Sequence, residues 1–200
     1  MLCMRINLPT FFAFLLLFSI SAFSQQQIYF DASNSLLRES IELIQKEQYG
    51  TARFKINQIQ RLEGHLSEVT RSDLAYSDAL CAVQLNDQDA AEKFDDFGRQ
   101  HRSSQWSARM KFLEGRVQFE EKRYSKALDA FNKVDTDQLP SFEKAELDYK
   151  KGFCLMKQNN IEEAVLSFEE ATKTESPFRN ASHYYLGHLF YTMNEDQKAE

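Results

Sequence analysis

A regularly spaced apolar pattern constrains the fold of this chain more than any other feature of its sequence. A small residue that opens a predicted helix recurs at intervals of 38, 37, 37 and 35 residues. Four residues after it come an isoleucine or phenylalanine, and seven residues after it another apolar or small residue. Positions i, i+4 and i+7 share one face of an α-helix. The pattern comprises Ala52, Ala90, Ala127, Ala164 and Ala199, then Ile56, Phe94, Phe131 and Phe168, then Ile59, Phe97, Val134 and Ala171.

A recurring glycine predicts another helix before each of the last three of these alanines. Gly115, Gly152 and Gly187 each precede the alanine of their repeat by 12 residues. Apolar residues surround each glycine at helical spacing, within 109–121, 145–157 and 184–193. Polar segments at 121–123, 158–160 and 194–196 then predict short turns between antiparallel helices. No segment has the alternation typical of a strand, so the sequence predicts an all-α chain.

Helix–turn–helix units with a glycine in the first helix and an alanine and an aromatic residue in the second resemble tetratricopeptide repeats. The best copies contain Gly115, Tyr124, Ala127 and Phe131, and then Gly152, Ile161, Ala164 and Phe168. The resemblance implies an α-solenoid of antiparallel helix pairs with a right-handed superhelix, because a single pair cannot bury its own apolar face. The expected units are about 33–70, 71–107, 108–144, 145–179 and an incomplete 180–200, within an array at 25–200.

Some positions depart from that family pattern. Ser40 and Asp78 occupy the glycine position of the first two units. In the third unit Glu114 and Gln118 fall at apolar positions, which we interpret as a register shift of one residue. The last unit stops where its second helix begins, so we expect the chain to be the front part of a longer protein.

The first 24 residues have the layout of a cleaved secretory signal. Arg5 precedes an apolar run from Leu8 to Phe23, and Ala22 and Ser24 provide the small residues of a cleavage site. The run is shorter than the ~20 residues that span a bilayer, which disfavours the alternative of a membrane anchor. No cysteine follows the run, so we expect no lipid anchor. Signal and repeats together resemble exported tetratricopeptide proteins of Bacteroidetes-type Gram-negative bacteria, which implies the periplasm or cell envelope.

Charge and cysteine content narrow the function further. Loss of Arg5 would leave 23 basic against 30 acidic residues, a net charge of −7 that disfavours nucleic-acid binding. Cys81 and Cys154 lie in apolar helical segments, where two buried free thiols are more usual than a disulfide. No histidine pair has metal-ligand spacing, and no phosphate-binding or nucleophile motif occurs. We therefore expect neither a cofactor nor a metal, and no enzyme activity.

The resemblance implies a binding surface along the first helices, which line the concave side of the superhelix in this family. An aromatic surface with two arginines suits a peptide or a partner helix, although each aromatic residue could instead belong to the core. Alternatives are an accessory arm of a larger envelope enzyme or transport component, and a glycan or peptidoglycan binder that uses Tyr149, Tyr184 and Tyr191. The candidate residues are Arg109, Phe112, Arg116, Phe119, Tyr149, Phe153, Met156, Tyr184, His188 and Tyr191.

Overall fold

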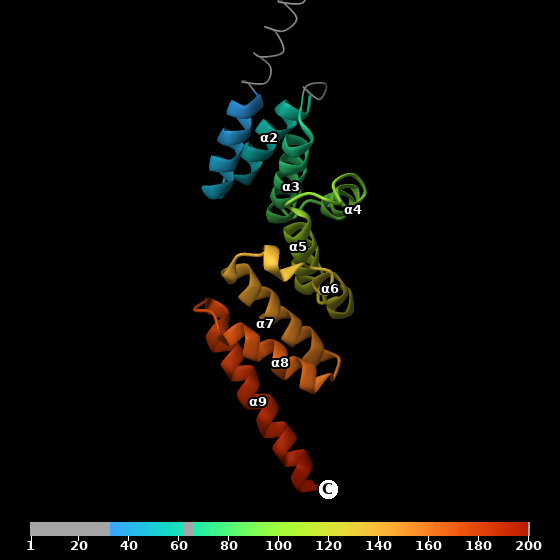
Figure 1. Cartoon of the computed structure of the whole chain (residues 1–200), viewed down its shortest axis with the longest axis vertical. Helices are drawn as coiled ribbons and strands as arrows, with labels where there is room; N and C mark the ends of the chain where they lie inside the picture. The colour runs from blue at the N-terminus through green and yellow to red at the C-terminus, as the bar shows by residue number, and fades with distance from the viewer. Residues whose placement is uncertain (1–32, 62–65, 200) are drawn as a thin grey trace, which may run out of the picture. The chain divides into compact units, whose positions relative to one another are not determined.

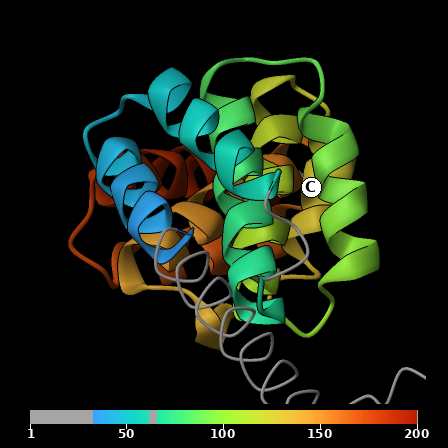
Figure 2. The same cartoon turned by 90° about the horizontal axis from the view of Figure 1, so that it is seen from above.

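A computed structural model describes residues 33–61 and 66–199 of the chain, with the backbone alone at 195–199. Every regular element in these ranges is helical, as both views of the ribbon show (Figures 1 and 2). The all-α prediction is therefore confirmed. The expected signal peptide lies outside the described residues. Within them, no helix combines the length and the apolar character needed to cross a membrane.

The chain divides into two compact units, residues 1–87 and 88–200. The described part of the first unit contains a helix at 33–45, α2 (Tyr49–Gln60) and α3 (Glu68–Gln84). The predicted face of α2 is buried, since Ala52, Ile56 and Ile59 are all inaccessible to solvent and pack with residues of α3. Ser67 begins α3 by accepting a hydrogen bond from the Thr70 amide.

The second unit holds the better copies of the repeat. In α6 and α8, the predicted alanine and phenylalanine lie in one core with residues of α5, α7 and α9. Helix α5 contacts α6, α7 contacts α8, and α8 also contacts α9. The elements are α4 (Ala90–Gln100), α5 (Ser107–Glu120), α6 (Tyr124–Phe131), the short 3₁₀ helix η2 (Thr136–Gln138), α7 (Ser141–Lys157), α8 (Ile161–Thr172) and α9 (Pro177–Ala199).

Two glycines mark where the helices of a pair cross. A Cβ atom placed on Gly152 would lie 2.9 Å from the ring of Phe168, and one on Gly115 would come still closer to the ring of Phe131. Both rings are fully buried. Interiors are packed too densely to absorb such an overlap without displacing a side chain. The phenylalanine of the second helix therefore requires a glycine in the first.

The turns within the helix pairs share one geometry. A residue with positive φ ends the first helix, and the amide that follows it donates to the carbonyl oxygen five residues back, as in a Schellman motif. The turns predicted at 121–123 and 158–160 are confirmed. The left-handed residues are Glu47, Asn86, Lys122 and Asn159.

The turn predicted at 194–196 is wrong, because α9 continues through these residues to Ala199. No glycine or proline interrupts this segment. The described residues also include no second helix folded back on the end of α9, so nothing in them holds the chain in a turn. By length alone, the 23 residues of α9 extend about 34 Å against about 18 Å for the 12 residues of α8. Figure 1 shows the second half of α9 running past α8.

Each residue that departs from the family pattern has its own structural environment. Asp78 is buried where the later units have glycine, and it pairs with the Arg53 guanidinium at 3.1 Å. Ser40 is fully buried and donates to the Leu37 carbonyl. The Oε1 atom of Gln118 is buried without a hydrogen-bond partner. Cys81 and Cys154 are buried free thiols, as predicted.

Candidate functional site

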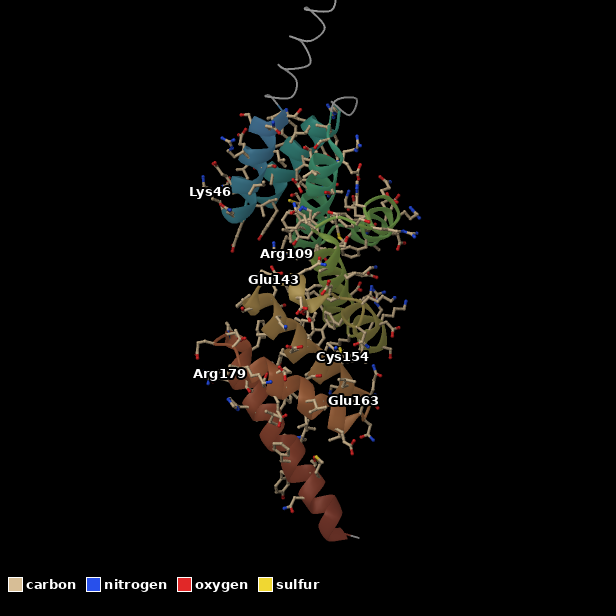
Figure 3. The ribbon with its side chains drawn as sticks, viewed as in Figure 1. Lys46, Arg109, Glu143, Cys154, Glu163 and Arg179 are labelled. Carbon is tan, nitrogen blue, oxygen red and sulfur yellow. The ribbon has the colours of Figure 1, made fainter. Side chains whose placement is uncertain are left out.

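Ion pairs join α5 to α7, the first helices of neighbouring pairs. Arg109 Nε donates to Glu143 Oε2 at 2.9 Å, and Arg116 Nε lies 3.0 Å from Glu146 Oε1. Figure 3 shows Arg109 and Glu143 next to each other. Both predicted arginines thus lie on the first-helix surface, and each already has a carboxylate partner. They are positioned to hold consecutive helix pairs together.

Lys150 strengthens this connection from within the protein. Its side chain is 8% exposed, and its ammonium lies 2.8 Å from Glu120 Oε1 and 3.8 Å from Glu146 Oε1. The same ammonium lies 4.2 Å from the ring centroid of Phe119, a favourable cation–π geometry. A lysine so deeply buried is stable only with such partners. Lys150 could not be identified from the sequence, because its helical position alone does not reveal the acidic residues that face it.

Most predicted aromatic residues of α5 and α7 pack against other rings. Phe119 and Phe153 meet edge to face at 5.5 Å, and Tyr149 lies 5.4 Å from Phe178 and 6.0 Å from Phe168. Phe119, Tyr149, Phe153 and Met156 are partly buried against the core. Burial raises the pKa of Tyr149, and so does its neighbour Tyr185. These residues contribute mainly to packing between helices.

Phe112 does not lie on the binding surface, contrary to the prediction from sequence. It is 4% exposed and packs 6.1 Å from Phe131 in the core, so it does not line a surface. The predicted register shift and the family position made the orientation of this helix ambiguous, and burial of the large ring resolves it. Tyr149 is likewise engaged with its neighbours, so the three-tyrosine platform of the glycan alternative does not form.

The remaining predicted residues lie on α9 and are open to solvent. Tyr184 is 69% exposed, Tyr191 is 66% exposed, and His188 is exposed as well. Phe190 beside them is 50% exposed, and a Cβ on Gly187 would have no atom within 4 Å. We call these five residues the open face of α9: Tyr184, Gly187, His188, Phe190 and Tyr191. Soluble proteins rarely leave several large apolar side chains exposed together without a function.

The sequence repeat shows which surface of α7 corresponds to the open face of α9. Gly187 follows Gly152 by 35 residues, and the same offset relates Tyr184 to Tyr149 and Phe190 to Leu155. In α7 those positions are covered by α8: Gly152 contacts Phe168, Tyr149 lies near the same ring, and Leu155 is buried. The open face of α9 is thus the equivalent of a surface that another helix covers one unit earlier. Gly187 and Phe190 are not among the predicted site residues, although the 35-residue offset is visible in the sequence.

A separate pocket of about 770 Å³ lies beside Arg109, between the loop before α5 and the segment before α7. The Arg109 guanidinium lies 5.5 Å from the Trp106 ring centroid. Since Arg109 also pairs with Glu143, the pocket has no unpaired charge from this residue to offer a ligand. The lining residues are Ser103, Ser104, Gln105, Trp106, Arg109, Gln138, Leu139 and Pro140.

The side chains with shifted pKa values do not cluster into a reactive centre. Burial raises the pKa of Asp148 on α7 to about 6 and the pKa of the Cys154 thiol to about 12. A thiol with so high a pKa is a poor nucleophile. Among the residues that the structure describes, no three histidine, cysteine or acidic side chains are grouped as metal ligands would be.

No protein-family model matches this sequence, and neither does any curated protein. Two solved structures are similar in fold: residues 41 to the end of MamA from Desulfovibrio magneticus RS-1, and the ArsTM double mutant of MamA RS-1. Each has a TM-score of 0.63 and 17% sequence identity, and the match covers 84% of this chain and 88% of the other. At this identity the likeness bears on fold alone. It supports the α-solenoid of tetratricopeptide type.

Proposed function

We propose that this chain is an exported scaffold that binds proteins or peptides in the periplasm or at the envelope of a Gram-negative bacterium, without catalysis of its own. The observation that carries the proposal is the open face of α9, where a tyrosine pair and Phe190 stand exposed at helical spacing. Large rigid side chains of this kind dominate the energy of protein interfaces. The helix-pair fold supports the proposal, since it presents helix surfaces on a rigid core.

Export and location rest on the sequence of the first 24 residues. The apolar run and the small residues before Gln25 favour cleavage there. Expression with the native N-terminus in a Gram-negative host should yield a periplasmic product that begins at Gln25. A product that keeps Met1 and stays with the cytosol would contradict the export proposal.

The scaffold function can be tested by affinity capture with the full chain. Envelope extract of the source cell is passed over the immobilised protein, and retained proteins are quantified by mass spectrometry. We expect specific partners that are lost when Tyr184 and Tyr191 are both changed to alanine. Helicity should be unchanged, because both side chains are largely exposed.

Phe54→Ala is the matched control, because Phe54 of α2 is another large exposed aromatic residue that lies outside α9. It should leave capture intact. If the wild-type chain retains no specific protein, the scaffold function is wrong. If the double variant retains the same partners, the binding surface lies elsewhere.

A further inference from the structure

We propose that the pocket between α4 and α5 binds a small aromatic carboxylate, with the ring inside the pocket and the carboxylate on Arg102. None of the residues that form this site belongs to the open face of α9. The proposal therefore goes beyond the scaffold function, and the two can fail independently.

The pocket lies within the second unit, where α4 and α5 contact each other (Figure 1). It has a volume of about 140 Å³. Phe94 and Phe97 of α4 and Met110 of α5 form apolar walls, and all three are buried. The buried His101 ring, 5.3 Å from that of Phe97, also lines the pocket. Such surroundings favour an aromatic group over a polar one.

The volume of the pocket matches a single aromatic ring. A dry apolar cavity of about 150 Å³ holds one benzene molecule. Aromatic rings attract one another in tilted and edge-to-face arrangements, and a methionine sulfur also contacts rings favourably. The pocket offers two phenylalanine rings and Met110 for these contacts. A phenyl ring is therefore the group that fills it.

Gly98 of α4 lines the pocket, and no close helix contact requires a glycine there. A Cβ atom placed on Gly98 would have no atom within 4 Å, whereas Gly115 and Gly152 each lie against a buried ring. Its φ is not positive either. The equivalent residues of the next two units are Asp135 and Thr172, so the repeat does not require glycine at this position. Since glycine weakens a helix, room for a ligand is the reason that this wall offers for it.

The permanent charge at the pocket is positive, because Arg102 and Lys111 line it and no lining residue is acidic. Lys111 is paired with Glu114 at 2.8 Å. Arg102 Nε donates to the Gly98 carbonyl at 3.1 Å, and among the side chains that the structure describes no carboxylate pairs with Arg102. A guanidinium binds a carboxylate through parallel N–H donors. Arg102 therefore favours an anionic ligand over a neutral or cationic one.

Hydrogen bonds in the segment between the helices hold Arg102 beside the pocket. The Ser107 hydroxyl lies 3.0 Å from the Arg102 carbonyl oxygen and 3.2 Å from that of His101. Ser107 is the first residue of α5, and the Arg102 side chain is bonded to the backbone of α4 through Gly98. Both helices thus position the guanidinium before a ligand arrives, which lowers the entropic cost of binding.

Isothermal titration calorimetry with the full chain tests the site. The probes are benzoate, phenylacetate and phenylpropanoate, which differ in the distance between ring and carboxylate. We expect saturable binding of at least one probe with a dissociation constant below about 1 mM. Acetate, which lacks the ring, should not bind. If none of the three aromatic probes binds saturably up to about 10 mM, the proposal is wrong.

Gly98→Leu tests whether the ring enters the pocket. A leucine side chain has open space there and should weaken binding at least about tenfold. Leucine favours a helix over glycine, so the variant should unfold at no lower temperature than wild type. Gly50→Leu is the matched control, because Gly50 is a helical glycine of the first unit whose Cβ would also have no atom within 4 Å. Equal affinity of wild type and Gly98→Leu overturns the proposal.

Arg102→Gln tests the carboxylate contact, and it should weaken binding of the aromatic acid at least about fivefold. Arg99→Gln is its control, because Arg99 is exposed on the same helix, pairs with Asp96 and does not line the pocket. Benzyl alcohol, a neutral ligand with the same ring, should bind more weakly than the acid and equally to wild type and Arg102→Gln. If Arg102→Gln binds the acid like Arg99→Gln does, Arg102 does not hold the carboxylate and the proposal is wrong.

The same ring and carboxylate occur in free aromatic acids and in a phenylalanine at the carboxyl end of a peptide. A tripeptide, acetyl-glycyl-glycyl-phenylalanine, is compared with phenylpropanoate in the same titration. Tighter binding of the tripeptide assigns the site to peptide ends, and weaker binding assigns it to free acids; both agree with the proposed chemistry. Binding of the tripeptide that is unchanged when its carboxylate is converted to the amide contradicts it.

Discussion

At the scale of single residues, the same amino acid has opposite effects at equivalent positions. Gly115 and Gly152 are required by a neighbouring ring, whereas Gly187 has open space beside it. Glycine inside a helix loses more backbone entropy on folding than alanine does. That cost is offset by the ring contact at the first two positions and has no such compensation at the third within the described structure.

Alanine substitutions should therefore change stability in opposite directions. We expect Gly115→Ala and Gly152→Ala to lower the free energy of unfolding by about 1–3 kcal/mol, because the new methyl group overlaps a buried ring. Gly187→Ala should raise it by about 0.5–1 kcal/mol through helix propensity. Urea unfolding followed by far-UV circular dichroism measures all three. Destabilisation by Gly187→Ala would mean that its surroundings are not open.

Asp148 makes a pH-dependent contribution to stability. Its pKa is raised from the model-compound value of 3.8 to about 6, chiefly by burial and to a lesser degree by Glu170, against the opposing effects of Lys151, Lys144 and Lys173. Since the folded pKa exceeds the unfolded one, this contribution is complete below about pH 4 and is lost as the pH rises through about 6. At neutral pH the partly buried carboxylate destabilises the fold.

We therefore expect Asp148→Asn to stabilise the protein at pH 7.5 by an amount on the order of 2 kcal/mol, and to have little effect at pH 3.5. Unfolding in urea across this pH range measures the difference. Asp129→Asn is the control, because Asp129 is exposed on α6. A difference between wild type and Asp148→Asn that stays constant with pH would contradict the assignment.

At the scale of helices, the connection between successive pairs depends on charges that sequence periodicity does not show. Lys150 lies on the α7 face toward α5, with Glu120, Glu146 and the Phe119 ring around its ammonium. Removing one member of a buried ion pair costs more than the pair contributes, because the remaining charge stays buried. Arg116 still faces Glu146 and limits that cost.

Lys150→Ala should lower the free energy of unfolding by about 2–4 kcal/mol. Lys126→Ala, at an exposed position on α6, should change it by less than about 0.5 kcal/mol. Glu120→Gln should have an effect below about 1 kcal/mol, because that carboxylate is 72% exposed. Chemical denaturation gives all three values. An effect of Lys150→Ala no larger than that of Lys126→Ala would show that the network does not stabilise the stack.

Helix type and the buried face of the second helices were predictable from sequence, because Ala127 and Phe131 keep a 3.6-residue period over a whole helix. The glycine–ring contact was predictable from the family pattern. The buried face of α5 was not predictable, since Phe112 and Gln118 favour different assignments of the residues on that face. The absent turn after Met193 was not predictable either: Asn194 resembles the other turn residues, and whether it reverses the chain depends on a helix to pack against.

The candidate site residues also include some that the sequence predicted correctly and others that it did not. The sequence predicts Tyr184, His188 and Tyr191 through their place in a first helix, and they are exposed. The same reasoning selected Tyr149 and Phe153, which pack against neighbouring rings. A single helix pattern cannot distinguish a face that binds the next helix from one that is open, because both need the same residues.

At the scale of the whole molecule, each compact unit contains its own core and one buried thiol. Cys81 packs with Ile56 and Leu74 in the first unit, and Cys154 packs with Phe131 and Phe168 in the second. Burial, together with the nearby Asp78, raises the pKa of Cys81 to about 11 against the opposing effect of Arg53. Burial raises that of Cys154 to about 12. Neither thiol should react while its unit is folded.

Thiol labelling at pH 8 should thus report the opening of each unit separately. We expect native rates about a hundredfold or more below those of the unfolded chain. As urea increases, Cys81 should react before Cys154, because the described core of the first unit is smaller. Peptide mapping by mass spectrometry identifies the modified residue. Equal reaction of both thiols at every urea concentration would mean that the two units unfold together.

The turns within the helix pairs have a consequence for how such a chain can change over time. Glu47 and Lys122 adopt a left-handed conformation that costs a non-glycine residue roughly 1–2 kcal/mol, and asparagine tolerates it better at Asn86 and Asn159. All four are exposed and contribute nothing to the buried faces of the helices. Mutation to glycine at these points could therefore compensate for destabilising changes elsewhere. A surface such as the one on α9 is then free to diversify toward new partners while the repeats stay folded.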